Sequence, residues 1–235
     1  MKPRRLAVIQ SSYVPWKGFF DFVNSVDEFV LYDDVEFSKG SFRNRNKIKT
    51  ASGLSWLTIP VNVTLGMPIK DVTIAKKDWG KRHWDQLHNA YRKAPHFDEI
   101  AALVKPLYDR DDWPTLTAVN LAFFELICNY LGVKTRTRMS MEFELVGDRV
   151  ERLINLAKAT GCQEYVSGPA AKAYLGSAEE RLFEENGVAL RYFDYGTYPP
   201  YEQLHPPFDH QVSILDLMFS CGKESTLYMR SFGQR

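Results

Sequence analysis

The chain opens with a pattern typical of a strand, a helix and a second strand. A short apolar run at residues 6–9 predicts a buried strand, and after a polar loop the aromatic residues of 16–23 predict a helix. Residues 29–32 form the next apolar run, so the opening indicates a β-α-β unit. Parallel strands need a crossover connection, and this restricts the chain to folds built on an open parallel or mixed sheet.

The same alternation returns in the last third of the chain. The pattern predicts a helix over 150–159, a strand over 164–166 and a strand over 188–193, with helices through Ala173 and Leu182 between the two strands. Both ends of the chain therefore predict an α/β fold with a mixed or mostly parallel sheet and flanking helices.

The middle of the chain follows two other patterns. Residues 56–63 and 69–74 carry the β-branched residues of two strands, which we expect to form a hairpin. From about 79 to 131 apolar residues recur every three or four positions, which predicts a helical block that ends at Gly132. No repeat or linker divides the sequence, so we expect a single domain over 1–235.

Charge and cysteine content narrow the class of protein. The 30 Lys and Arg oppose 29 Asp and Glu, so any anion site must come from a local cluster rather than from the field of the whole protein. The three cysteines lie far apart without metal-ligand spacing, which fits a reducing compartment. The first apolar run is too short for a signal peptide, and no run reaches the length of a membrane span. We expect a cytoplasmic protein with no membrane partner and no resident metal.

A basic segment at 38–49 is the most informative local feature. If it is extended, its cationic side chains alternate with uncharged ones and share one face of the strand: Arg43, Arg45, Lys47 and Lys49. Such a row is better explained if a polyphosphate, a carboxylate or an RNA backbone neutralises it. We expect Lys39 and Asn44 to bind substrate beside Arg43, Arg45 and Lys47. The alternative is a solvated loop.

Polar residues follow the first two predicted strands. Ligands of open α/β sheets bind at the carboxyl ends of strands, so we expect substrate contacts from Gln10, Trp16 and Lys17. Tyr13 is a candidate for catalysis, and Asp33 or Asp34 is a candidate base or magnesium ligand. The alternative for the aspartates is an ion pair with the basic segment.

Two further observations concern sites for anions and known motifs. Ser167 and Gly168 precede Pro169, where a strand leads into a predicted helix, and this turn is a candidate phosphate site or a purely structural turn.

No G-x-G-x-x-G, G-x-S-x-G or H-E-x-x-H sequence occurs, so classical dinucleotide folds, α/β-hydrolases and zincins lose their support.

Several motifs occur in order along nearly the full chain. They are Gln10-x-x-Tyr13-x-Pro15-Trp16-x-Gly18-x-Phe20 and the segments 29–39, 44–49, 56–61, 90–95, 165–169 and 212–219. Together they resemble the WbqC-like protein family. The sequence departs from the family pattern at Ser11 and Ser12, where the family usually shows Pro-Asn, and near Ser220 and Cys221, where an Asn often follows the phenylalanine.

The resemblance implies a place in bacterial surface-polysaccharide (O-antigen) biosynthesis and an activity as a glycine transferase. The strand–loop–helix opening is also remotely similar to the nucleotidyltransferase and class I aminoacyl-tRNA synthetase fold. No histidine precedes His83 here, so the histidine-rich nucleotide loop of that fold is missing.

Our leading hypothesis is an acyl or aminoacyl (glycyl) transferase acting on an amine. Arg43, Arg45 and Lys47 would anchor a nucleotide-linked or other small-molecule donor, or an aminoacyl-tRNA, and Asp33 or Asp34 would deprotonate the amine. One alternative is a nucleotidyltransferase or ATP-dependent ligase that uses Mg²⁺ with a nucleotide. Another is a non-catalytic binding protein. The sequence does not indicate the cofactor or the oligomeric state.

Overall fold

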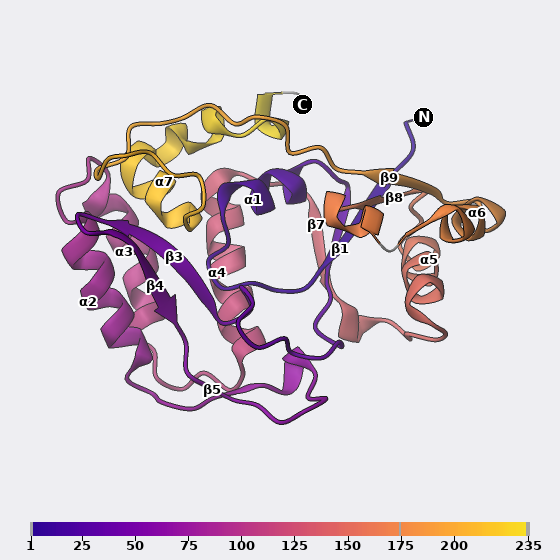
Figure 1. Ribbon diagram of the computed structural model, residues 1–235, viewed down its shortest axis with the longest axis horizontal. Coiled ribbons are helices and arrows are strands. Elements are labelled where there is room, and N and C mark those ends of the chain that lie inside the picture. Colours follow the sequence, from indigo (N-terminus) through magenta and orange to yellow (C-terminus); the bar gives the residue numbers. More distant parts are fainter. Residues whose placement is uncertain (1, 174, 234–235) are drawn as a thin grey trace. The chain divides into compact units, whose positions relative to one another are not determined.

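The computed structural model describes residues 2–173 and 175–233, which fall into two compact units (Figure 1). The sheet unit contains Met1–Gln10, Phe22–Asp34 and Lys134–Thr197. The helical unit contains Ser11–Asp21, Val35–Val133 and Tyr198–Arg235. Each unit thus combines three separate segments of the chain. The single domain expected over 1–235 stays a prediction.

Five strands form the parallel sheet of the sheet unit: β1 Arg5–Ile9, β2 Glu28–Leu31, β7 Arg136–Met139, β8 Glu164–Ser167 and β9 Ala189–Tyr192. Their order is β7-β2-β1-β8-β9, and every neighbouring pair is parallel. The predicted α/β class is confirmed. The sequence pattern did not reveal β7, because Arg136-Thr137-Arg138 at this edge strand lacks an apolar run.

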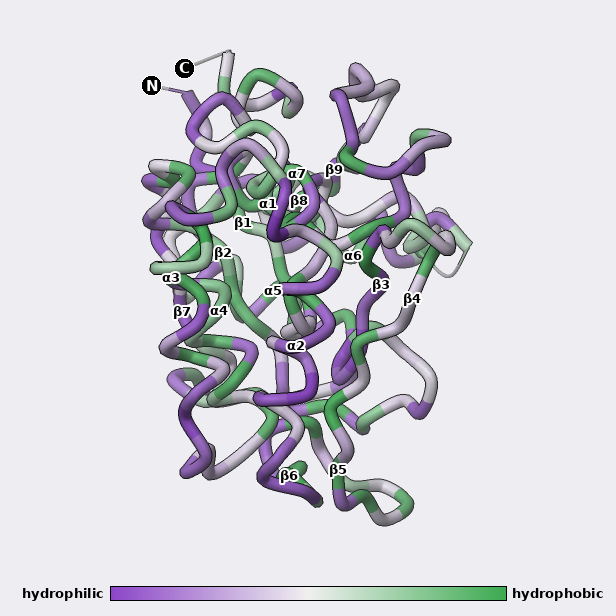
Figure 2. Tube along the Cα trace, turned by 90° about the vertical axis from the view of Figure 1, so that its left-hand side faces the viewer, coloured by the Kyte–Doolittle hydropathy of each residue, from purple (hydrophilic) through white to green (hydrophobic). Residues whose placement is uncertain are grey.

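Helices with one apolar face accompany these strands. The sheet unit contains α5 Arg149–Ala159, α6 Ser177–Glu185 and the 3-10 helices Ser140–Glu142 and Pro169–Ala173. Asp148 caps α5, because its carboxylate accepts hydrogen bonds from the amides of Val150 and Glu151. The four residues of β2 are all buried, and after the hydrophilic Glu28 the trace in Figure 2 is green along the rest of the strand. Helix α1, Lys17–Asn24, contributes residues to both units.

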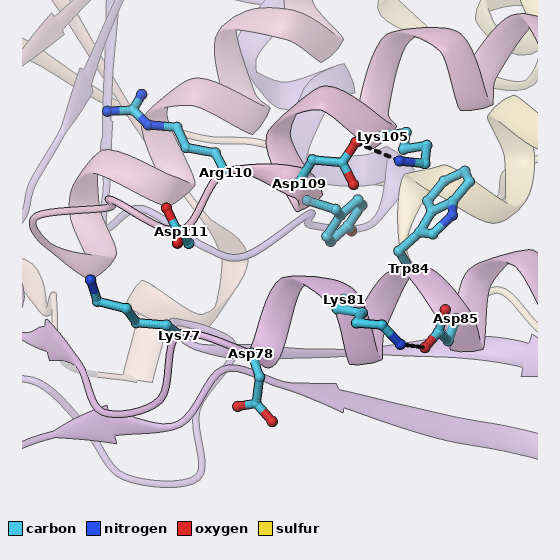
Figure 3. Close-up of a pocket in the computed structure, with 10 residues that line it drawn as sticks. Lys77, Asp78, Lys81, Trp84, Asp85, Lys105, Asp109, Arg110 and Asp111 are labelled. Atoms are coloured by element: carbon cyan, nitrogen blue, oxygen red, sulfur yellow. Dashed lines mark hydrogen bonds and ion pairs between the residues drawn. The ribbon is translucent and has the colours of Figure 1, made fainter.

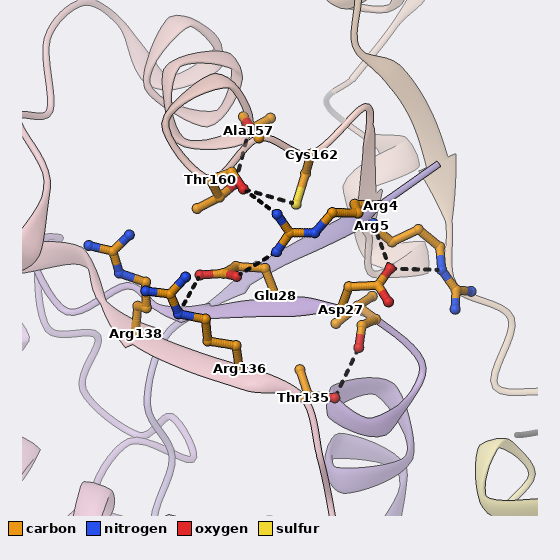
Figure 4. A network of polar contacts seen from close by, with 12 residues as sticks. Arg4, Arg5, Asp27, Glu28, Thr135, Arg136, Arg138, Ala157, Thr160 and Cys162 are labelled. Carbon is orange, nitrogen blue, oxygen red and sulfur yellow. Dashed lines mark hydrogen bonds and ion pairs between the residues drawn. The ribbon is translucent and has the colours of Figure 1, made fainter. Parts of the chain in front are cut away.

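A buried carboxylate marks the amino-terminal edge of the sheet. Glu28, 1% exposed, begins β2 and pairs with Arg4 at 3.2 Å and with Arg136 at 3.8 Å (Figure 4). The Arg4 guanidinium also donates to the Thr160 carbonyl at 3.2 Å. Because ligands of parallel sheets bind at the opposite edge, we assign this network to stability.

Among the described residues, the helical unit contains four complete α-helices and two small hairpins, beside the first part of α1: α2 Trp79–Tyr91, α3 Phe97–Asp109, α4 Leu116–Leu131, α7 Ile214–Cys221, β3 Arg45–Thr50, β4 Gly53–Thr58, β5 Val61–Asn62 and β6 Thr73–Ile74. It also contains 3-10 helices at Ile69–Asp71, Gly222–Tyr228 and Ser231–Gly233. Gly132 ends α4 at a φ of 73°, a left-handed conformation that glycine adopts without steric cost.

The predicted hairpin between 56–63 and 69–74 is wrong in most of its extent. Residues up to Thr58 belong to β4, which pairs with β3, and only Val61–Asn62 pairs with Thr73–Ile74. Pro60 has no amide proton to donate to a ladder, and it separates β4 from β5. In the described part of the chain, no helix is long and apolar enough to cross a membrane.

Candidate functional site

The carboxyl edge of the sheet carries polar residues that the sequence singled out. Gln10 follows β1, Asp33 and Asp34 follow β2, and Ser167 ends β8. Because the strands are parallel, all of these positions lie along one edge of the sheet unit. In chain order the strands run 3-2-1-4-5, so the direction of winding reverses between β1 and β8. Ligands of doubly wound sheets bind at such a switch point, and Gln10 and Ser167 flank it.

The two adjacent aspartates have different surroundings. Asp33 is fully buried, and its amide donates to the Ser140 hydroxyl at 3.1 Å. Asp34 is only partly buried, and the Ser140 hydroxyl donates to its Oδ2 at 2.6 Å. Asp34 is therefore the carboxylate that a ligand at this edge can reach, and Ser140 orients it. Sequence reasoning missed Ser140 because it missed β7, the strand that this serine follows.

The turn at Ser167 and Gly168 is less suited to an anion than the sequence suggested. Pro169–Ala173 is a 3-10 helix of five residues, too short to align the dipoles of a full helix. Ser167 itself is buried at the end of β8. The position of Ser167 and Gly168 at the switch point remains the reason to consider them for binding.

In the helical unit, hydrogen bonds join the loop that follows β1 to β3 and to the segment before it. The Tyr13 amide donates to the Phe42 carbonyl at 3.0 Å, and the Arg43 guanidinium donates to the Ser11 carbonyl at 2.9 Å. The Asn46 side chain donates to the carbonyls of Tyr13 and Val14 at 3.2 and 2.8 Å. Two predicted site residues, Tyr13 and Arg43, thus lie together, held in part by an asparagine that the sequence reasoning did not select.

The Tyr13 hydroxyl belongs to a buried polar triad. It lies 2.9 Å from His83 Nδ1 and 3.0 Å from the Tyr108 hydroxyl. Burial raises the pKa of Tyr13 well above its usual value and lowers the pKa of His83 to about 4, so both groups are neutral at physiological pH. The side chain of Tyr13 is fully buried. Its predicted catalytic role would require a substrate to reach the hydroxyl, which His83 and Tyr108 cover.

Lys17 is buried as well, next to two tyrosine rings. Its Nζ donates to the Pro199 carbonyl at 3.1 Å and lies 5.2 and 5.1 Å from the ring centroids of Tyr198 and Tyr201. Trp16 packs edge-on against Tyr198 at 5.8 Å. Desolvation by burial lowers the pKa of Lys17 to about 8. Trp16 and Lys17 therefore pack against the segment that follows Thr197, and their predicted contacts with substrate stay a prediction.

The predicted row of four cations is reduced to two by the structure. The strand begins only at Arg45, and Arg43 lies in the preceding turn. Lys49 is 4% exposed, and its Nζ donates to the Pro207 carbonyl at 2.5 Å. Arg45 and Lys47 remain on the more exposed face, where they lie 4.3 and 5.2 Å from the Trp56 ring centroid.

A cavity of about 320 Å³ adjoins this end of the hairpin. Its walls include Lys39, Gly40, Asn44, Thr58 and Pro60, so two predicted binding residues line it. The Asn44 side chain donates to the Ile59 carbonyl at 2.8 Å, and the Arg45 guanidinium donates to the Gly40 carbonyl. Its volume is at the lower end of the range for small-molecule sites.

A second cavity, of about 590 Å³, lies between α2 and α3 (Figure 3). Several charged side chains of its wall form ion pairs with one another: Lys81 with Asp85 at 3.1 Å and Lys105 with Asp109. Exposed ion pairs of this kind contribute little free energy. In the part of the chain that the structure describes, no group of three or more His, Cys, Asp or Glu side chains could hold a metal ion.

Comparison with known proteins gives a consistent assignment. Residues 10–228 match the WbqC-like protein family. A protein of Mycobacterium tuberculosis (strain ATCC 25618 / H37Rv), named "Uncharacterized protein Rv1507c", is 42% identical over 229 residues, which cover 97% of this chain and 98% of the relative. No solved structure matches the chain at a significant level. The match spans both the sheet edge and the hairpin, and we conclude that the chain belongs to the WbqC-like protein family.

Proposed function

We propose that this protein is a transferase that moves an acyl or aminoacyl (glycyl) group to an amine in surface-polysaccharide or related small-molecule biosynthesis. The biosynthetic setting is the one that the family resemblance implies. The single observation that carries the proposal is the 320 Å³ cavity with Lys39 in its wall, where the carbonyl of Gly40, another wall residue, accepts from the Arg45 guanidinium. Donors of activated acyl groups commonly carry phosphates, and cations at the rim of a cavity favour such anions.

Within the sheet unit, we propose Asp34 as the base for the amine. Asp34 is the partly exposed carboxylate at the carboxyl edge, with Ser140 holding its Oδ2. In the reaction the amine nitrogen forms a bond to the acyl carbon, the bond from that carbon to the oxygen or thioester sulfur of the donor breaks, and the donor leaves with the electron pair. Asp34 takes the proton that the amine loses.

A transfer assay tests this proposal. The purified protein is incubated with glycyl-tRNA, a glycyl adenylate or an acyl thioester and with amino-sugar nucleotides, and products are identified by mass spectrometry. We expect the substitution Asp34→Asn to lower kcat by about 100-fold or more, because general-base catalysis contributes about that factor. Asp85→Asn on the exposed face of α2 is the matched control and keeps full activity. Full activity of a folded D34N variant would contradict the role of Asp34.

The strand order favours a second candidate, nucleotidyl transfer or ATP-dependent ligation. The order 3-2-1-4-5 is that of the first five strands of nucleotide-binding doubly wound sheets. Mg²⁺ is often held by one or two carboxylates together with substrate phosphates, and Asp34 is a partly exposed carboxylate at this edge that would serve as such a ligand. Incubation with labelled ATP or CTP distinguishes the candidates, because only this reaction releases pyrophosphate in step with product.

A further inference from the structure

The charge of the helical unit is concentrated in one segment. Residues 37–70 contain six Lys and Arg and no Asp or Glu. The whole chain has a formal charge of +1, so the segment carries +6 and the remaining residues carry −5. A nearly neutral protein therefore has one strongly cationic stretch, and the β3–β4 hairpin is its centre.

Large apolar side chains are exposed within this same cationic stretch. Phe42 and Trp56 are 50% and 40% exposed, although Arg45 and Lys47 lie over the Trp56 ring. The two rings are 6.0 Å apart, and Leu54, 42% exposed, precedes Trp56 on the same face of β4. Leu57, on the other face of the strand, is fully buried. The outward face of the hairpin thus combines planar rings with cations.

This combination selects among anionic partners. Inorganic phosphate or a carboxylate needs cations but gains nothing from exposed rings, whereas a single-stranded nucleic acid needs both. Its bases stack on aromatic side chains and on guanidinium planes, and its phosphates pair with Lys and Arg. A duplex hides the faces of its bases, so it would use only the cations.

We propose that the outward face of the β3–β4 hairpin binds a single-stranded segment of nucleic acid, with bases stacked at Phe42 and Trp56 and phosphates at Lys39, Arg45 and Lys47. This inference deepens the proposed function, on which it rests, because it identifies the donor as a group carried on an unpaired nucleic-acid end. Arg45 Nε is buried and has no hydrogen-bond acceptor among the described residues. If the guanidinium shifts toward a bound strand, a backbone phosphate would supply that acceptor.

Fluorescence anisotropy with labelled oligonucleotides of about eight nucleotides tests the inference without any acyl donor. We expect single-stranded RNA or DNA to bind and a matched duplex to compete poorly. Comparison of the RNA and DNA oligonucleotides identifies which source the face prefers. Trp56→Ala is expected to weaken binding about tenfold, and Trp56→Phe restores most of the affinity because a ring remains. Lys47→Ala should lower the slope of log affinity against log salt by about 1.

Controls and outcomes separate this inference from the proposed function. Lys105→Ala, a cation in the wall of the other cavity, should leave oligonucleotide binding unchanged, and circular dichroism verifies the fold of each variant. Absence of binding, or W56A binding as tightly as the unsubstituted protein, overturns the inference. Oligonucleotide binding without acyl transfer overturns the proposed function alone, whereas transfer from a thioester without oligonucleotide binding overturns only the inference.

Discussion

At the scale of single residues, the most demanding group is the buried carboxylate of Asp216. Its Oδ2 accepts from the Tyr91 hydroxyl at 2.8 Å, and its Oδ1 accepts from the Tyr201 hydroxyl at 2.6 Å and from Gln203 Nε2 at 2.9 Å. The side chain has no exposed surface. These three donors connect the segment 198–213 and α2 to Asp216 in α7. A buried carboxylate needs such hydrogen bonds, because a buried charge is tolerated only when it is hydrogen-bonded.

Substitution of Asp216 tests this arrangement. Asp216→Ala leaves three buried donors without their acceptor, and we expect the free energy of unfolding to fall by about 3 kcal/mol. Urea titration followed by circular dichroism measures the loss. The exposed substitution Asp98→Ala is the control and should change stability by less than about 0.5 kcal/mol.

The ionisation of Asp216 also makes stability depend on pH. Desolvation raises the pKa of this carboxyl in the folded protein, so the folded state binds the proton more readily than the unfolded chain. Its contribution to the free energy of unfolding is therefore largest below the unfolded pKa and falls as pH rises through the folded pKa. We expect Asp216→Asn to gain stability relative to the unsubstituted protein as pH rises above about 4, the usual pKa of an aspartate in an unfolded chain. A constant difference above that pH would contradict the raised pKa.

Lys17 has the opposite dependence. Burial lowers its pKa to about 8, so the folded state releases the proton before the unfolded chain does. The free energy of unfolding should therefore rise as pH increases from about 8 toward the usual lysine pKa. We expect this rise to exceed that of the Lys17→Met variant by roughly 2 kcal/mol. Thermal or urea unfolding of both proteins across this range measures it, and parallel curves would mean that Lys17 titrates as an ordinary lysine.

At the scale of elements, one asparagine joins the opening loop to β3. The Asn46 side chain holds the carbonyls of Tyr13 and Val14, and Val14 has a φ of 35°, a region that β-branched residues rarely occupy. The Ser213 hydroxyl, which also caps α7, donates to the Val14 carbonyl at 2.7 Å. The loop is thus held in a strained conformation by hydrogen bonds from two distant elements.

Removal of the Asn46 amide should release this loop. We expect Asn46→Ala to lower the free energy of unfolding by about 2 kcal/mol, because two buried carbonyls lose a donor. Hydrogen exchange at the Tyr13 amide should increase as well. Asn62→Ala on the exposed hairpin β5–β6 is the matched control, and an equal effect of both substitutions would refute the special role of Asn46.

The β3 region also shows how far sequence periodicity reaches. Alternation correctly placed Arg45 and Lys47 opposite Asn46 and Ile48, because neighbouring side chains on a strand must point to opposite faces. It failed at Arg43, which lies in the turn before the strand. It also failed at Lys49, whose side chain is buried and donates a hydrogen bond to the Pro207 carbonyl. That carbonyl lies far along the chain, so no local pattern contains it.

At the scale of the whole molecule, the chain passes repeatedly between its two units. Helix α1 is continuous across the boundary between Asp21 and Phe22, with Phe20 stacked on Phe124 in the helical unit and Phe22 stacked on Phe193 in the sheet unit. Each unit needs three segments that are separated in sequence. We therefore expect the two units to unfold in one cooperative transition.

The tryptophans allow a direct test of this cooperative unfolding. All five belong to the helical unit, so their fluorescence follows the unfolding of that unit. Phe29→Ala removes a fully buried ring from β2 in the sheet unit, at a cost of about 3–5 kcal/mol. If unfolding is cooperative, the midpoint followed by tryptophan fluorescence shifts as far as the midpoint followed by circular dichroism. A fluorescence midpoint that does not move would show that the units unfold independently.

Much of this protein follows from its sequence alone. The apolar runs at 6–9, 29–32 and 164–166 indicated β1, β2 and β8, and Gly132 marked the end of α4, because strand periodicity and helix caps depend on residues close in the chain. The parallel class followed from the crossover connections. The ordered motifs indicated the family.

Only the tertiary structure decided the order of the strands and the fate of individual polar groups. The pairing of β7 with β2 and the different burial of Asp33 and Asp34 depend on Ser140 and its strand, which lie about a hundred residues away. The sequence predicts catalysis by Tyr13 and substrate contacts from Lys17, yet His83 and Tyr108 cover Tyr13, and Tyr198 and Tyr201 cover Lys17. Burial is set by which distant segments pack together, and local periodicity carries no information about that choice.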